Sequence, residues 1–174
     1  MILEKDGVRL TFPEGWEAIE WDKDNGFHKK NAAKTRENLR SVDIVAYDSN
    51  ARTLWLIEIK DHTRHKRVDD RPLHMVLAEK AIDTMGSLHA AAKTTISEST
   101  DVLSARKFVS QSEKVHFIYI GMEPAHTSRL WGTGIDKSDL GLALRQRIRC
   151  IDAHPRVANT SNWSRELQWN AQKS

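Results

Sequence analysis

Two carboxylates and an amine, those of Asp43, Glu58 and Lys60, have the types and spacing that chemistry at a charged centre would need. Asp43 lies near the start of a segment, 42–48, that is rich in β-branched and aromatic residues. The other two lie near the end of a second such segment, 53–60. Ser and Asn between the segments favour a turn. The sequence therefore predicts two antiparallel strands whose charged residues meet at one end.

Pairing Asp48 with Thr53 would place Asp43 opposite Glu58, and Lys60, two residues further on, would point to the same side of the sheet. The rest of that face is apolar, so two carboxylates there are costly unless another group compensates their charge. A divalent cation would do so, and Mg²⁺ usually needs only one or two protein carboxylates.

Two other interpretations stay open at this point. Lys60 could bridge both acids, which would make the three residues a structural ion pair network. A loop one residue longer or shorter would put Asp43 and Glu58 on opposite faces of the sheet, because side chains alternate along a strand.

This order of elements, an Asp on one strand, an acid-x-Lys on the next and then a long helix, resembles the PD-(D/E)xK nuclease superfamily. The matching residues are Asp43 and Glu58-Ile59-Lys60, and the resemblance covers roughly 42–121. Val42 stands where the motif has Pro. The resemblance implies an α/β, restriction-endonuclease-like fold with a central mixed β-sheet flanked by α-helices on both faces.

The resemblance also implies a divalent-metal-dependent nuclease, a hydrolase of phosphodiester bonds, with DNA favoured over RNA. Asp43, Glu58 and the backbone carbonyl of Ile59 would hold Mg²⁺ or Mn²⁺, and Lys60 would orient the attacking water or offset charge on the phosphate. The alternative is a catalytically inactive module on the same fold that binds nucleic acid or a protein partner.

Members of the superfamily often carry a further acid upstream, for which Glu17, Glu20 and Glu37 are candidates, although each taken singly is typical of a surface acid. Lys80 falls inside the apolar arc of a helix expected over 71–93, so it should either reach the helix edge or meet an acid. It is a secondary candidate for the site.

The 174 residues fit a single domain, with a core at about 42–121, N-terminal strands at 8–22 and a C-terminal helix and tail at 136–174. The single cysteine excludes an intrachain disulfide and a Cys-rich zinc site. No segment reaches the ~20 apolar residues of a membrane span, and the first residues lack the core of a signal peptide. These features favour the cytoplasm and no membrane contact.

The net charge of +3 is unevenly placed. Segment 28–40 has five basic residues against one acid, and segment 60–71 has five against three, so both flank the expected hairpin with excess positive charge. This placement favours nucleic acid, DNA above all, as the partner. A homodimer stays open, because double-strand cleavage by so small a domain often needs two copies.

The spacing of apolar residues and the positions of Gly and Pro predict the remaining helices and strands. Segment 16–22 fits either a strand or one helical turn, and Gly121 should end a buried strand. Trp163 and Trp169 could stack on bases, but burial is their commoner use. Further strands are expected at 8–12 and 114–120, and further helices at 97–110 and 136–151.

Overall fold

The structure, a computed structural model, describes residues 1–35, 37, 39–61, 70–96, 98–122, 136–160, 163 and 167–174. His62 and His65, two histidines of the basic segment 60–71 whose spacing matches no zinc-binding helix, and the loop expected at 131–134 lie outside these residues. No described helix combines the length and the apolar character that crossing a membrane requires.

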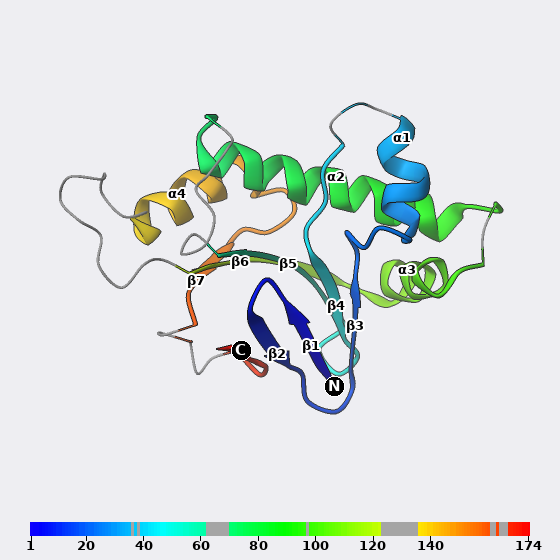
Figure 1. The fold of residues 1–174 in the computed structure, drawn as a ribbon, viewed down its shortest axis with the longest axis horizontal. Coiled ribbons are helices and arrows are strands. Elements are labelled where there is room, and N and C mark those ends of the chain that lie inside the picture. Colours follow the sequence, from blue (N-terminus) through cyan, green and yellow to red (C-terminus); the bar gives the residue numbers. More distant parts are fainter. Residues whose placement is uncertain are drawn as a thin grey trace.

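A five-stranded mixed sheet forms the centre of the fold (Figure 1). Each of its first three strands is antiparallel to the next among them, and the last two strands run parallel to the third. In spatial order the strands are β3 (Trp16–Glu20), β4 (Ile44–Asp48), β5 (Thr53–Asp61), β6 (Lys114–Met122) and β7 (Arg156–Ala158). The segment with two interpretations, 16–22, is therefore a strand over most of its length.

The register of the β4–β5 hairpin is the one expected from the sequence. Asp48 pairs with Thr53 and Ile44 with Ile57, so one further step places Asp43 opposite Glu58. The Asp48 carboxylate stabilises the turn, because its Oδ1 accepts the backbone N–H groups of Asn50 and Ala51. The hairpin thereby fixes which face each charged side chain joins.

A layer of helices covers one face of this sheet (Figure 1). It contains the π-helical turn η1 (His28–Ala32), α1 (Ala33–Thr35), α2 (Leu73–Lys93), α3 (Thr100–Gln111) and α4 (Lys137–Ile148). Helix α2 begins at Leu73, two residues later than the sequence suggested, because Pro72 is its N-cap. Helix α4 begins as expected, since the Asp136 carboxylate accepts the backbone N–H groups of Ser138 and Asp139.

The prediction of helices on both faces is wrong for the described part of the chain. A three-stranded sheet of β1 (Ile2–Lys5), β2 (Val8–Thr11) and β8 (Asn170–Lys173) covers the second face instead (Figure 1). Alternating residues Val8 and Leu10 point inward, and the aromatic rings of Phe12, Trp16 and Trp169 fill the space against the central sheet. Bulky aromatic residues thus supply the apolar area that a helix would otherwise bury.

The two ends of the described chain meet in this small sheet, where β2 pairs with both β1 and β8. The strands β1, β7 and β8 were not predicted from the sequence. Two of them, β7 and β8, lie in a polar tail rich in Asn and Ser. Only three residues of β7 and one inward residue of β8, Ala171, carry the pattern that would have marked them as strands.

Candidate active site

Asp43 and Glu58 lie side by side on the helix-facing side of the central sheet. Their side chains continue the apolar row of Val45 and Leu56, which packs beneath α2. Both are buried, with 5% of Asp43 and 3% of Glu58 exposed. The structure therefore places two carboxylates at the end of a core face, where they lose the hydration that would stabilise their charge.

The backbone on either side of Asp43 is held by hydrogen bonds. Its Oδ2 accepts the N–H of Ile59 at 2.7 Å, and its backbone carbonyl accepts the N–H of Trp21 at 2.8 Å. The N–H of Val42 donates to the hydroxyl of Thr84 on α2 at 2.9 Å. Strands β3 and β5 and helix α2 together fix the position of this carboxylate.

Glu58 has one partnered and one unpartnered oxygen. Its Oε1 accepts a hydrogen bond from the ammonium of Lys80 at 2.6 Å. Its Oε2 is buried and has no hydrogen-bond partner among the described residues. Burial, and next the negative charge of Asp43, raise the pKa of Glu58 to about 8. Burial likewise raises the pKa of Asp43, against the opposing effect of Lys80.

Lys80 lies in the apolar arc of α2, and its ammonium contacts an acid, Glu58, rather than extending to the edge of the helix. Burial alone would lower the pKa of its ammonium, but Glu58 and Asp43 together raise it. Its side chain is 17% exposed. The cluster therefore contains a charged amine supplied by the helix rather than by the strand.

Lys60 lies on the same side of β5 as Glu58, but its side chain is exposed. Among the described residues its effect on the site is that of a nearby positive charge, which lowers the pKa of Glu58. The amine expected beside the two acids is thus at the rim, while Lys80 makes the direct contact.

None of the three upstream acids named from the sequence joins the cluster. Glu17 pairs with Lys107, Glu20 pairs with Lys5, and Glu37 is exposed. The negative charge of Asp22 raises the pKa of both Asp43 and Lys80, and that of Asp6 makes a smaller contribution at Asp43, so Asp22 is the acid outside the pair that acts on it most.

The carboxylate of Asp22 is 27% exposed, and the nearest amines are Lys29 at 3.7 Å and Lys5 at 3.8 Å. Only the pairing of β3 with β4 could have identified Asp22 from the sequence. The β3–β4 register pairs Glu20 with Ile44, so the residues just after Glu20 run alongside Asp43.

Tyr119 borders the cluster from the neighbouring strand, because it pairs in register with Glu58. A Cβ atom built on Gly121 would lie 2.9 Å from a carbon of the Tyr119 ring, so only glycine leaves room for the ring there. Gly121 does not end the strand as expected, since β6 continues to Met122. Its role is to let the phenol lie along β6 toward the level of Lys60.

The chemistry of these donors fits a hard divalent cation. Glu58 Oε2 is a buried acceptor without a partner among the described residues, and burial, which raises the pKa of both acids, disfavours their charged forms unless a cation stabilises them. The described residues contain no group of three or more His, Cys, Asp or Glu side chains arranged around one point. A cation here would therefore take two carboxylates and a carbonyl, with water completing its shell, as Mg²⁺ commonly does.

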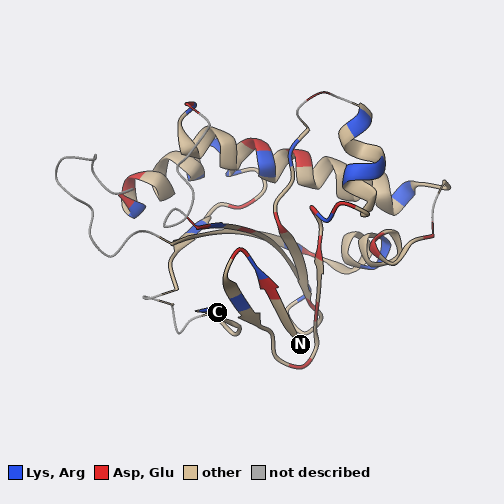
Figure 2. Ribbon diagram, viewed as in Figure 1, with Lys and Arg blue, Asp and Glu red and all other residues tan. Residues whose placement is uncertain are grey.

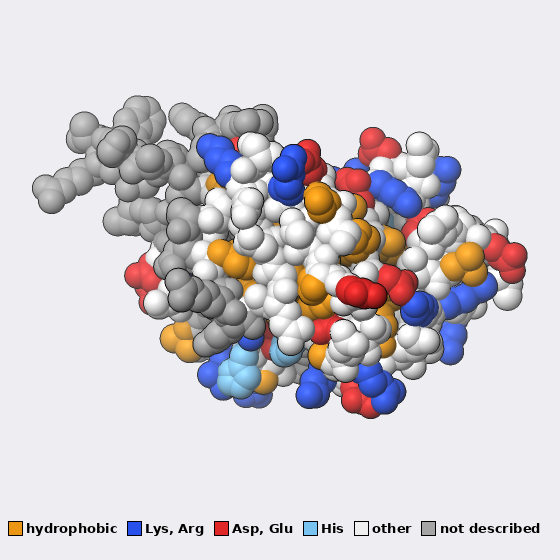
Figure 3. Space-filling view, turned by 90° about the horizontal axis from the view of Figure 1, so that it is seen from below, with side chains coloured by type: hydrophobic (Ala, Val, Ile, Leu, Met, Phe, Trp, Pro, Cys, Tyr) orange, Lys and Arg blue, Asp and Glu red, His pale blue; other side chains and the backbone are white. Residues whose placement is uncertain are grey.

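Part of the positive charge in the flanking segments is paired with carboxylates. Figure 2 shows basic residues on η1 and α1, and one of them, Lys29, lies 3.2 Å from the carboxylate of Asp24. The face seen in Figure 3 shows Lys and Arg interspersed with Asp and Glu around its edge.

Neither a model of a known protein family, nor a curated protein, nor a solved structure matches the chain.

Proposed function

We infer that the chain is a divalent-metal-dependent nuclease of the PD-(D/E)xK type, with a restriction-endonuclease-like fold and with DNA favoured over RNA as substrate. The observation that carries this proposal is the pair of buried carboxylates, Asp43 and Glu58. They face each other across adjacent strands, and Glu58 Oε2 has no partner among the described residues. Such a pair is costly in a core unless a ligand compensates it.

Asp43, Glu58 and the carbonyl of Ile59 would hold the cation, either Mg²⁺ or Mn²⁺. When bound, such a cation polarises a phosphoryl oxygen and lowers the pKa of water. The N–H of Ile59 keeps Asp43 oriented at 2.7 Å, so that its carboxylate need not reorganise when substrate arrives. Asp22 would serve as the further acid, because it is near the pair and partly exposed.

Two amines are available to offset charge that develops on the phosphate. Lys60 is exposed at the rim, where a phosphate could reach it. Lys80 is bound to Glu58, and its ammonium becomes available to a phosphate oxygen when Glu58 takes another partner. We assign the rim position to Lys60 and the inner position to Lys80.

The test is incubation with supercoiled plasmid, linear duplex, single strands and RNA, each with Mg²⁺, Mn²⁺ or EDTA. Cleavage should require the cation and should be lost in Asp43→Asn. Lys60→Ala and Lys80→Ala should each lower cleavage while leaving binding of the nucleic acid largely intact. Full cleavage by the Asp43→Asn variant, or in EDTA, would refute the proposal.

One observation favours a second candidate, a module that binds nucleic acid or a protein partner without turnover. The site already contains an internal counter-ion for Glu58, and both carboxylates are almost wholly buried. Such a module would bind DNA with an affinity that falls with salt and needs no cation. Binding without any metal-dependent stabilisation would therefore favour it over the nuclease.

A further inference from the structure

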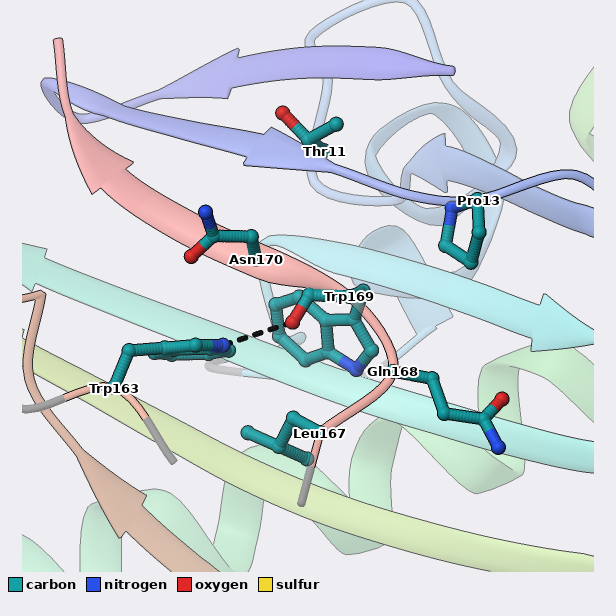
Figure 4. A pocket seen from close by; sticks show the side chains of 7 residues that line it. All are labelled: Thr11, Pro13, Trp163, Leu167, Gln168, Trp169 and Asn170. Carbon is teal, nitrogen blue, oxygen red and sulfur yellow. Dashed lines mark hydrogen bonds between the residues drawn. The ribbon is translucent and has the colours of Figure 1, made fainter. Parts of the chain in front are cut away.

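A pocket of about 480 Å³ opens on the opposite side of the central sheet from Asp43 and Glu58 (Figure 4). The end of β2 and the tail that leads into β8 form its walls. The lining residues combine aromatic and aliphatic side chains with a hydroxyl and two amides; they are Thr11, Pro13, Trp163, Leu167, Gln168, Trp169 and Asn170. Its volume suits one ring system with its substituents.

The indole of Trp163 is held in place rather than free to rotate. Its Nε1 donates to the backbone carbonyl of Trp169 at 2.8 Å, and the two ring centroids lie 4.8 Å apart at 61°. Trp169 is itself buried against Phe12. Trp163 is only half-buried, so the pocket contains a flat apolar surface whose orientation is already set.

Hydrogen-bonding groups surround this surface. Asn170 is exposed, and its amide offers both donors and an acceptor, the combination that pairs with the edge of a base. It lies on the same side of Trp169 as Trp163, whereas the side chain of Gln168 extends away beyond Trp169 (Figure 4). The hydroxyl of Thr11, opposite Asn170 in the β2–β8 ladder, is exposed as well. The pocket therefore joins a stacking face to an exposed amide and a hydroxyl, as a heteroaromatic ring requires.

The polar surface extends from the pocket along the small sheet. Thr11 and Asn170, which line the pocket, face each other in the β2–β8 ladder, and the next outward pair is Arg9 and Gln172. All four side chains are exposed. A strand that placed one base in the pocket could therefore lay its next phosphate near Arg9, whose guanidinium also contacts Glu4.

We propose that this pocket binds one unpaired nucleobase of a single strand, stacked on Trp163 with its edge against Asn170. It is a contact separate from the buried acids, because the central sheet lies between them. A proline-rich peptide would need a succession of parallel aromatic ridges, whereas the described pocket presents one half-exposed indole beside an exposed amide.

The test is fluorescence anisotropy of labelled eight-nucleotide single strands titrated with the full chain in EDTA, so that cleavage plays no part. Trp163→Ala should weaken binding about tenfold, within the range for losing one stacked base. Asn170→Ala should weaken it about threefold, since exposed hydrogen bonds contribute less. Leu103→Ala, an exposed apolar residue on α3, is the matched control and should leave affinity unchanged.

Several results would overturn the proposal. Equal affinity of the folded Trp163→Ala protein and the unchanged protein would remove the stacking role. If Trp163→Ala fails to fold, Asn170→Ala decides, because that side chain is exposed, and an unchanged affinity there refutes the pocket. Displacement of the strand by a proline-rich peptide, or equally tight binding of free nucleoside monophosphates, would reassign the occupant. Because no metal or cleavage is involved, failure here leaves the nuclease test standing.

Discussion

Lys80 on α2 donates to Glu58 on β5 at 2.6 Å, and this contact joins the helix layer to the acidic end of the sheet. The two residues are 22 positions apart in sequence. The ion pair is almost wholly out of water, with 4% of the Glu58 side chain and 17% of the Lys80 side chain exposed. The attraction within such a pair contributes little net stability, because both charges lose their hydration. Removing one partner is costly, because the other charge is then buried without compensation.

Lys80→Ala should therefore destabilise the fold in a pH-dependent manner. At pH 5 Glu58 is already protonated, since its pKa is raised to about 8, and the loss should be small. At pH 9 the unmodified protein contains the ion pair, whereas the variant must either bury an unpaired carboxylate or hold a proton on it, because Lys80 lowers the pKa of Glu58. The free energy of unfolding should then fall by up to roughly 3–5 kcal/mol. Urea unfolding at both pH values checks this, with Lys60→Ala as the exposed control. Equal losses at the two pH values would contradict the expectation.

Glu58 should also make the unmodified protein less stable as the pH rises. A carboxyl whose pKa is raised from 4.5 to about 8 on folding binds its proton more tightly in the native state. Its stabilisation is complete below pH 4.5 and is lost as the pH approaches 8, with a slope of up to about 1.4 kcal/mol per pH unit. Urea unfolding from pH 5 to pH 8 without metal should show this decline. Glu58→Gln should flatten it, and parallel slopes for the two proteins would argue against the shift.

Mg²⁺ binding should strengthen with pH over the same interval, because the cation competes with the proton on Glu58. Calorimetric titration near pH 7 in two buffers of different ionisation enthalpy should show release of about one proton. Asp43→Asn should abolish the binding. A pH-independent affinity would mean that Glu58 is not a ligand.

Thr84→Val should loosen the segment that carries Asp43. Thr84 is fully buried, and its hydroxyl accepts the N–H of Val42, so a methyl in its place leaves a buried donor unpaired. The expected loss is about 1–3 kcal/mol in the free energy of unfolding, with reduced cleavage. Thr84→Ser keeps the acceptor and should retain the activity. Identical cleavage by the Val and Ser variants would exclude a positioning role for the hydroxyl.

Gly121→Ala should be costly only while the ring of Tyr119 is present. The added Cβ would lie 2.9 Å from that ring, which must move, at roughly 1–3 kcal/mol. In a Tyr119→Ala background the same change should cost much less, and a double-mutant cycle of unfolding free energies measures the difference. Additive losses would show that the ring does not constrain residue 121.

The sequence was sufficient for the hairpin and its register, because period-two alternation and a two-sided apolar core leave few other pairings. The apolar arc of α2 and the Asp136 cap were readable for the same local reason. These local features predict Asp43 opposite Glu58, and the observed register of β4 and β5 agrees.

What could not be predicted depends on contacts between distant segments. The partner of Glu58 is Lys80 rather than Lys60, and that choice follows from how α2 lies across the sheet. Asp22 became visible only when β3 was placed beside β4. Helices on the second face were implied by the resemblance, and β8, which lies there instead, has too few inward residues to show a period in its polar tail.

The distribution of the described tryptophans gives the two faces separate optical reporters. The indole N–H of Trp21 donates to Ser87 on α2 at 3.0 Å, on the side of the acidic pair. Trp16, Trp55, Trp163 and Trp169 cluster beyond the sheet. Trp131 lies outside the described residues and would be replaced by Phe in every protein compared. With Trp21→Phe as the reference, a change in emission on adding Mg²⁺ could then be attributed to one side of the molecule and a change on adding an oligonucleotide to the other.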